Sequence, residues 1–172
     1  GVPVFYIPRM RLPDPTLERA AGFLIPSLHS SSVLGVGVKV PYFIPIGDHK
    51  DITITPFVTN KTKTLELRYR QAFRNGKITF EGAVSDDELT TKDSRGYIFG
   101  EGEFRFDNGI ALRFDIEAVS DDSYLIDYNH FEKDRLDSEI ELEFVDRDSY
   151  RRGALTYYHT LRPGENSATL PT

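Results

Sequence analysis

Apolar and polar residues alternate with a period of two along most of this chain. The clearest run, 110–118, places apolar side chains at every second position, with Arg113, Asp115 and Glu117 between them. This period is typical of a β-strand with one apolar and one charged face, as in an antiparallel sheet whose two sides meet different media. We therefore predict an all-β fold, an antiparallel meander of about nine strands, at 22–28, 33–43, 51–59, 64–74, 77–84, 96–107, 110–119, 138–146 and 150–160.

The connections between these strands alternate in length. Asn75-Gly76 and Asn108-Gly109 lie between alternating runs, which predicts tight hairpins. Long polar segments, Ser85–Arg95 and Ser120–Ser138, separate these hairpins. Short turns on one side and long loops on the other are typical of transmembrane β-barrels. A spanning helix is excluded, because no run approaches the roughly 18–20 apolar residues that it needs.

Two prolines interrupt the first two predicted strands. Pro26 follows Gly22-Phe-Leu-Ile, and Pro41 follows fifteen residues later, after Val40. Proline cannot donate a hydrogen bond to a strand ladder, so it belongs at an edge, a strand start or a bulge. Two neighbouring strands broken in this way predict a sheet that is weak along one seam.

Composition narrows the class of protein further. The net charge of -6 disfavours a nucleic-acid partner, because no basic stripe is present to neutralise phosphates. The absence of cysteine excludes disulfides and thiolate chemistry. Because the chain starts with Gly1 already inside a strand-like run at 2–12, we interpret it as a segment of a longer protein.

No group of residues predicts catalysis, a cofactor or a metal site. The four histidines are far apart in sequence and are interpreted as surface or loop residues. We interpret Asp86-Asp87-Glu88 and Asp121-Asp122 as solvated loop carboxylates, because neither has the spacing or glycine of a calcium loop. Aromatic residues near strand ends fit either the interfacial girdles of a membrane barrel or the core of a sandwich: Tyr42, Phe43, Phe57, Phe73, Tyr97, Tyr150, Tyr157 and Tyr158.

An ordered series of proline-bearing motifs resembles one known family. The motifs are Val4–Pro8 with Arg11-Leu-Pro13, Gly22–Pro26, Val40–Phe43 and Asp51–Pro56, followed at compatible distances by Glu66–Tyr69 and Ser120–Tyr124. This series resembles the lipopolysaccharide-assembly family LptD, also called the organic-solvent-tolerance family. Such proteins have a periplasmic jellyroll followed by a very large outer-membrane barrel, which a lipoprotein, LptE, plugs.

The resemblance implies a fold and a function for each part. Residues 1–21 would end the periplasmic domain and link it to the barrel, and residues 22–172 would be the first strands of an incomplete barrel. Alone, this segment would be a curled open sheet, sandwich-like or oligomeric, since its edges are free. Pro26 and Pro41 would mark a lateral seam through which lipopolysaccharide enters the outer leaflet, without catalysis. Lumen-facing candidates are Glu66, Arg68, Arg70, Arg113, Asp115 and Glu117.

The implied partners are lipopolysaccharide, an LptE-like plug, periplasmic bridge proteins and the outer membrane, in which the full-length protein would reside. Two other classes remain open on the residues alone. One is a soluble β-barrel or sandwich module that binds lipid or carbohydrate, with the apolar positions forming a dry core. The other is an enzyme on a β scaffold, which the lack of a clustered His, Asp or Ser constellation disfavours.

Overall fold

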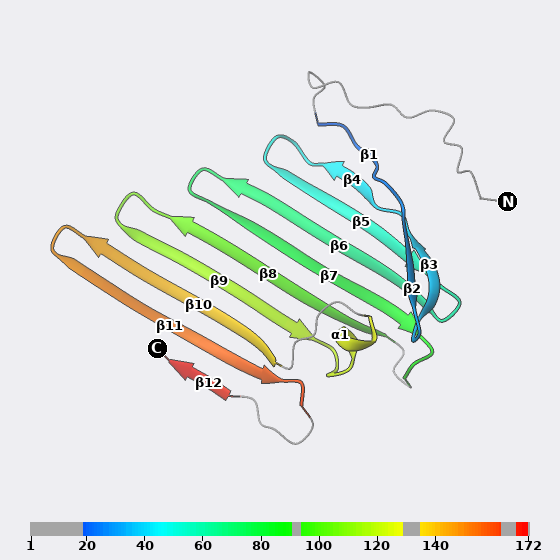
Figure 1. The fold of residues 1–172 in the computed structure, drawn as a ribbon. Coiled ribbons are helices and arrows are strands. Elements are labelled where there is room, and N and C mark those ends of the chain that lie inside the picture. The colour runs from blue at the N-terminus through cyan, green and yellow to red at the C-terminus, as the bar shows by residue number, and fades with distance from the viewer. Residues whose placement is uncertain (1–18, 91–93, 129–134, 163–167, 172) are drawn as a thin grey trace.

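A computed structural model describes residues 19–90, 94–128, 135–162 and 168–171 of the chain. These residues form one open antiparallel sheet and a single helical turn (Figure 1). The elements are β1(Gly22–Phe23), β2(Ser27–Ser31), β3(Gly35–Lys39), β4(Tyr42–Pro45), β5(Lys50–Val58), β6(Thr62–Phe73), β7(Gly76–Asp87), β8(Arg95–Arg105), β9(Ile110–Val119), α1(Tyr124–Asp127), β10(Arg135–Asp146), β11(Ser149–Thr160) and β12(Ala168–Pro171).

The sheet is a meander in which each long strand pairs with its neighbours in sequence. Its order is β1-β4-β5-β6-β7-β8-β9-β10-β11-β12, with the β2–β3 hairpin joined through β3 to β5. The predicted all-β meander is confirmed, and the strand pattern predicted from residue 51 onward is close to the observed one. The short β12 was not predicted. The extended segment predicted at 2–12 lies outside the described residues.

The first two predicted strands are wrong as continuous elements. The predicted strand 22–28 is divided into β1 and β2 by residues 24–26, and the predicted strand 33–43 is divided into β3 and β4 by residues 40–41. Each break contains one of the two prolines, as expected where a ladder donor is missing. The sequence pattern therefore located the interruption but understated its effect.

Connections on the two edges of the sheet differ in length. One edge carries the short connections 46–49, 74–75, 106–109 and 147–148, and the other carries one short connection, 59–61, and the long ones 88–94, 120–134 and 161–167 (Figure 1). Gly109 has a φ of +79°, which a glycine adopts without strain. At the other predicted hairpin the turn is Arg74-Asn75, because Gly76 already pairs with Phe73. The hairpin was therefore predicted correctly but shifted by one residue.

The two faces of the sheet carry different side chains. Residues in register share a face, and the row Thr53, Arg68 and Glu81 on successive strands is polar. The adjacent row Leu67, Gly82 and Ile98 is apolar. This apolar face is uncovered by the described residues, and many of its large side chains are about half exposed, including Val58, Val84, Ile98, Ile140, Leu142 and Leu155.

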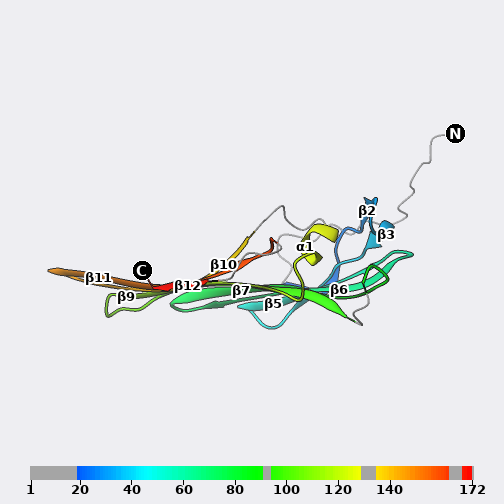
Figure 2. The ribbon, with the colours of Figure 1, turned by 90° about the horizontal axis from the view of Figure 1, so that it is seen from below.

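The polar face is partly covered at the edge that carries the long connections. Figure 2 shows α1 and the β2–β3 hairpin on the same side of the sheet. They meet in a core that includes Leu34 from the β2–β3 turn, Phe57 from β5, and Tyr124, Leu125 and Tyr128 from the α1 segment. The chain thus buries its core against the polar side and leaves the apolar side of the sheet open.

Candidate functional site: the polar face and the proline seam

All six predicted polar candidates lie on the polar face of the sheet, because they alternate with the apolar rows. Arg70 donates to the buried Asp51 from Nε (3.0 Å) and Nη2 (3.2 Å), and Arg19 donates to the same carboxylate at 2.5 Å. Farther along the sheet, Arg113 Nη1 donates to Glu141 Oε1 at 2.7 Å.

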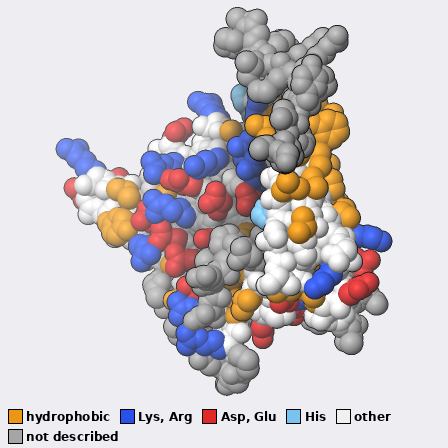
Figure 3. Space-filling view, turned by 45° about the vertical axis from the view of Figure 1, so that its right-hand side comes forward, with side chains coloured by type: hydrophobic (Ala, Val, Ile, Leu, Met, Phe, Trp, Pro, Cys, Tyr) orange, Lys and Arg blue, Asp and Glu red, His pale blue; other side chains and the backbone are white. Residues whose placement is uncertain are grey.

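Of the other four candidates, Arg68 and Glu117 lie in one cross-strand row, joined through Glu81 and Phe99. Glu117 lies near the long connections, where its Oε2 accepts from the Asp137 amide at 3.1 Å. Glu66 pairs with Lys39. Charged side chains of both signs are interspersed over this side of the molecule (Figure 3). Because most carboxylates have a cation nearby, the face is hydrophilic without a large excess of either charge.

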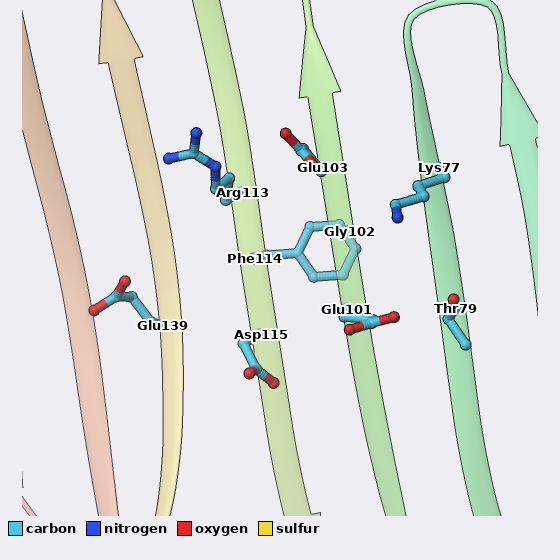
Figure 4. A pocket seen from close by; sticks show the side chains of 9 residues that line it. All are labelled: Lys77, Thr79, Glu101, Gly102, Glu103, Arg113, Phe114, Asp115 and Glu139. Carbon is cyan, nitrogen blue, oxygen red and sulfur yellow. The ribbon is translucent and has the colours of Figure 1, made fainter.

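A polar hollow of about 320 Å³ lies over β7, β8, β9 and β10. Figure 4 shows its lining, in which Arg113 and Asp115 of β9 lie beside Glu101 and Glu103 of β8 and Lys77 of β7. The structure therefore brings together two of the predicted residues with three that the sequence analysis did not single out. Cross-strand register explains the group, since Lys77, Glu103 and Arg113 are paired in one row.

A second hollow of about 270 Å³ lies beside the first strands, and we name it the seam cleft. Its lining includes Leu24 and Pro41 on one side, Thr53 and Arg68 on its floor strands, and Tyr97 of β8. Two of the predicted polar candidates, Glu66 and Arg68, and one of the predicted seam prolines therefore belong to one site. Pro26 does not line it.

Three prolines accompany the bend between the first strands and the rest of the sheet. Pro26 and Pro41 occupy the breaks in the strands, and Pro56 lies in β5, fifteen residues after Pro41. The Val40 amide donates to the Pro56 carbonyl at 3.3 Å, and the Leu24 amide donates to the Pro41 carbonyl at 2.8 Å. The sequence analysis assigns no role to Pro56, and the signal that could have found it is the fifteen-residue spacing that Pro26, Pro41 and Pro56 share.

The pairing along this bend is sparse. β1 has two residues and β4 has four, whereas β6 and β7 have twelve each. β3 pairs with β5 only at Val38 and Lys39, and β4 pairs with β5 beyond the break. Ladder hydrogen bonds are therefore fewest where the prolines lie.

A buried ion cluster holds the α1 segment on the polar face. The Arg95 guanidinium, with 1% of its side chain exposed, donates to Asp121 at 2.9 Å and 2.7 Å, to Asp127 at 2.8 Å and to Ser123 Oγ at 2.9 Å. Its Nη1 also reaches the fully buried Asp87 at 3.4 Å. The interpretation of Asp87 and Asp121 as solvated loop carboxylates was therefore wrong, because Arg95 neutralises both.

Hydroxyl groups extend this cluster into the sheet. Tyr128 Oη donates to Asp87 Oδ2 at 2.7 Å and also lies 2.7 Å from Thr62 Oγ1. Tyr124 Oη lies 2.6 Å from Ser85 Oγ. Hydrogen bonds from Arg95 hold the pKa of the Asp121 carboxyl far below its ordinary value, so this anion persists through the physiological pH range.

The aromatic residues divide between two surroundings. Phe57 and Tyr97 pack in the core on the polar face. Phe73, Phe104 and Phe106 lie together near the short connections, with ring centroids 5.5 Å and 6.4 Å apart. Phe57 and Tyr97 therefore belong to a core, and the interpretation of the other aromatic residues as an interfacial girdle stays a prediction.

Two features are absent from the described ranges. None of their helices has the length and apolar character required to cross a membrane. They contain no cluster of three or more His, Cys, Asp or Glu side chains suited to a metal ion.

An open antiparallel sheet with one charged face, one exposed apolar face and short connections along one edge has the architecture of a segment of a β-barrel wall. Residues 93–172 match the family model LptD, described as LPS transport system D. The chain is homologous to LptD proteins over most of its length, and the resemblance carried by its proline-bearing motifs is confirmed.

Three curated relatives illustrate the match. The LPS-assembly protein LptD of Shewanella frigidimarina is 33% identical over 157 residues, which cover 86% of this chain and 20% of the relative. The proteins of the same name from Pseudoalteromonas atlantica and Acidovorax sp. are 30% and 34% identical, over 73% and 75% of this chain and 17% and 16% of the relatives. The chain thus spans about a fifth of the length of the relatives it matches.

Proposed function

We propose that this chain forms part of the wall of an outer-membrane β-barrel that inserts lipopolysaccharide into the outer leaflet without catalysis. The observation that carries the proposal is the separation of the long strands into one charged and one apolar face. On this proposal residues 1–21 end a periplasmic domain and its linker, and residues 22–172 begin the barrel. Its partners are lipopolysaccharide, an LptE-like lipoprotein plug and periplasmic bridge proteins.

The exposed apolar face supports an assignment of which side of the sheet meets lipid. Side chains such as Ile98 and Leu142 are 50% and 53% exposed, and a water-exposed face of this extent would promote aggregation. Contact with lipid would remove this tendency to aggregate, and closure of the barrel would satisfy the hydrogen-bonding groups of the strand edges. The polar face, with Arg68 and Arg113, then lines the lumen.

The proline bend supports a lateral seam at the first strands. Each proline removes one ladder donor, and a net backbone hydrogen bond contributes roughly 0.5–1.5 kcal/mol in water and more beside lipid. Two-residue β1 and four-residue β4 leave little pairing to break. We propose that strands bearing Pro26 and Pro41 separate there, so that acyl chains pass into the bilayer while the sugars move along the polar face.

Site-specific photo-crosslinking in the full-length protein tests the orientation. A crosslinking residue at Thr55, on the polar face, should capture lipopolysaccharide during transport. The same residue at Ile98 or Leu142, on the apolar face and far from the prolines, should capture phospholipid instead. Equal capture of lipopolysaccharide on both faces would refute the proposal. Capture of neither lipid by the apolar face, with a water-soluble monodisperse protein, would favour the soluble module.

A further inference from the structure

The seam cleft contains two buried polar atoms that have no partner among the described residues. Thr53 Oγ1 and Arg68 Nε are both shielded from solvent, and neither makes a hydrogen bond. Thr53 as a whole is only 5% exposed. An unsatisfied buried polar group costs free energy, and native structures contain few of them. These two are cross-strand partners, Thr53 of β5 and Arg68 of β6, and both line the cleft.

The rest of the lining defines the chemistry that would satisfy them. Among the described residues that line the cleft, Arg68 supplies the one guanidinium, and Glu66 and Glu81 place two carboxylates beside it. Glu66 is already paired with Lys39. Thr53 and Thr55 add hydroxyls, which both donate and accept. Sites for phosphate gather several cations or helix N-termini. This cleft instead offers mixed donors and acceptors without excess positive charge, which matches the vicinal hydroxyls of a sugar ring.

The apolar part of the lining supports the same ligand class. Tyr97 forms one wall of the cleft, and Leu24 and Pro41 form the side toward the seam. An aromatic or aliphatic wall packs against the C–H groups of a sugar while its hydroxyls meet the polar floor. A volume of about 270 Å³ suits one part of a large ligand rather than the whole of it.

We propose that the seam cleft is a saccharide subsite, in which Arg68 Nε and Thr53 Oγ1 bind hydroxyl oxygens of one sugar ring. This inference rests on the proposed function and adds to it. The sugar portion of the transported lipid would be held beside Pro41 while its acyl chains leave through the seam. Binding would satisfy the two orphaned atoms at the position where the strands separate.

The test uses the full-length protein with its lipoprotein partner in detergent, titrated calorimetrically with dephosphorylated core oligosaccharide. The variants Thr53→Val and Arg68→Met each remove one of the orphaned atoms and keep the bulk of the side chain. Each should weaken binding about tenfold or more, as expected for one lost hydrogen bond involving a charged or buried group. The control Thr79→Val removes a hydroxyl from the same face outside the cleft and should leave binding unchanged.

A thermal melt separates binding from structure. Thr53→Val replaces a buried hydroxyl that has no partner, so the melting temperature should stay the same or rise while affinity falls. Wild-type affinity in both variants, or no oligosaccharide binding by the wild type, would overturn the subsite. Tight binding of inorganic phosphate that Arg68→Met abolishes would also overturn the saccharide assignment.

Lipopolysaccharide delivery by the same proteins, reconstituted into liposomes with the periplasmic bridge proteins, distinguishes the two proposals. If the wild type delivers the lipid and the variants bind oligosaccharide normally, the subsite falls and the proposed function stands. If the wild type delivers none, the proposed function falls.

Discussion

Replacing Arg95 by methionine should release the α1 segment from the sheet. The change removes the cation that neutralises Asp87, Asp121 and Asp127 and keeps the aliphatic part of the side chain. Removing one partner of a buried ion pair costs about 3–5 kcal/mol. We expect the lower end of that range, because the side chains of Asp121 and Asp127 are 16% and 24% exposed and can become hydrated.

The buried Asp87 carboxylate determines how much of the free-energy cost of Arg95→Met remains after Asp121 and Asp127 are hydrated. Its side chain is fully buried, and without Arg95 it keeps the Tyr128 hydroxyl at 2.7 Å and the Leu89 amide at 3.0 Å. A penalty of about 3 kcal/mol raises the open population of the segment roughly 100-fold. Hydrogen exchange measures this population at the amides of Asp127 and Tyr128, which bond to the carbonyls of Ser123 at 2.9 Å and Tyr124 at 3.1 Å.

Arg113→Met is the matched control. Arg113 pairs with Glu141 on the same face, but 43% of its side chain is exposed, and such pairs contribute only about 0–1 kcal/mol. Exchange in the α1 segment should therefore be unchanged in this variant. A change of less than tenfold in Arg95→Met, or an equal change in both variants, would refute the assignment of Arg95 as the anchor. If Arg95→Met does not assemble, Tyr128→Phe removes one bond to Asp87 and should raise exchange by a smaller factor.

Three further outcomes are expected. Gly102→Ala should destabilise the folded protein by about 1–3 kcal/mol in a urea titration, because a Cβ there would lie 2.2 Å from the Phe114 ring, whereas Gly153→Ala, with nothing within 4 Å, should not. Folding lowers the pKa of Asp121, so its contribution to stability is complete above the unfolded pKa of about 3.9 and is lost as the pH falls below that value. Hydrogen exchange at the Tyr128 amide, corrected for the intrinsic rate, should therefore be constant from pH 7 to 5 and should rise only under stronger acid. Leu142→Arg should cost about 2–4 kcal/mol of stability in lipid if its face meets the bilayer, and an equally stable variant would contradict that orientation.

Sequence periodicity predicted the long strands well because their two faces differ so strongly. From β5 to β11 apolar and polar residues alternate almost without interruption. A shift of one residue in strand register would therefore move the apolar side chains to the polar face and the polar side chains to the apolar face. The same reasoning placed all six polar candidates on one face. It located the hairpin at Asn75-Gly76 one residue late, since dipeptide preference does not fix which residues pair.

The Arg95 cluster could not be predicted in this way. Arg95 meets Asp87, Asp121 and Asp127 at sequence separations of 8, 26 and 32 residues, and these contacts depend on the path of a long connection. Periodicity describes strands and says nothing of a connection that folds back over them. The available clue was a motif, because Asp121 and Tyr124 belong to the series that resembles the family, but the sequence analysis gave that motif no physical role.

The seam cleft was missed for a related reason. Thr53 and Arg68 are ordinary strand residues in the sequence, and only their register and burial reveal two orphaned atoms. The prolines were visible at once. What the structure adds is that the Pro41 break lies beside this cleft, and that Leu34 of the bent β2–β3 hairpin packs into the same core as Tyr124 and Tyr128.

The most direct test of the central claim is lipopolysaccharide delivery by the full-length Pro26→Val, Pro41→Val double variant. Valine restores both backbone donors and favours strand structure, so the seam should hold together and delivery to the outer leaflet should fall severalfold while the protein still assembles. Pro45→Val changes the same residue type at the far end of β4 and should deliver normally. Delivery by the double variant at the rate of the wild type would contradict the account.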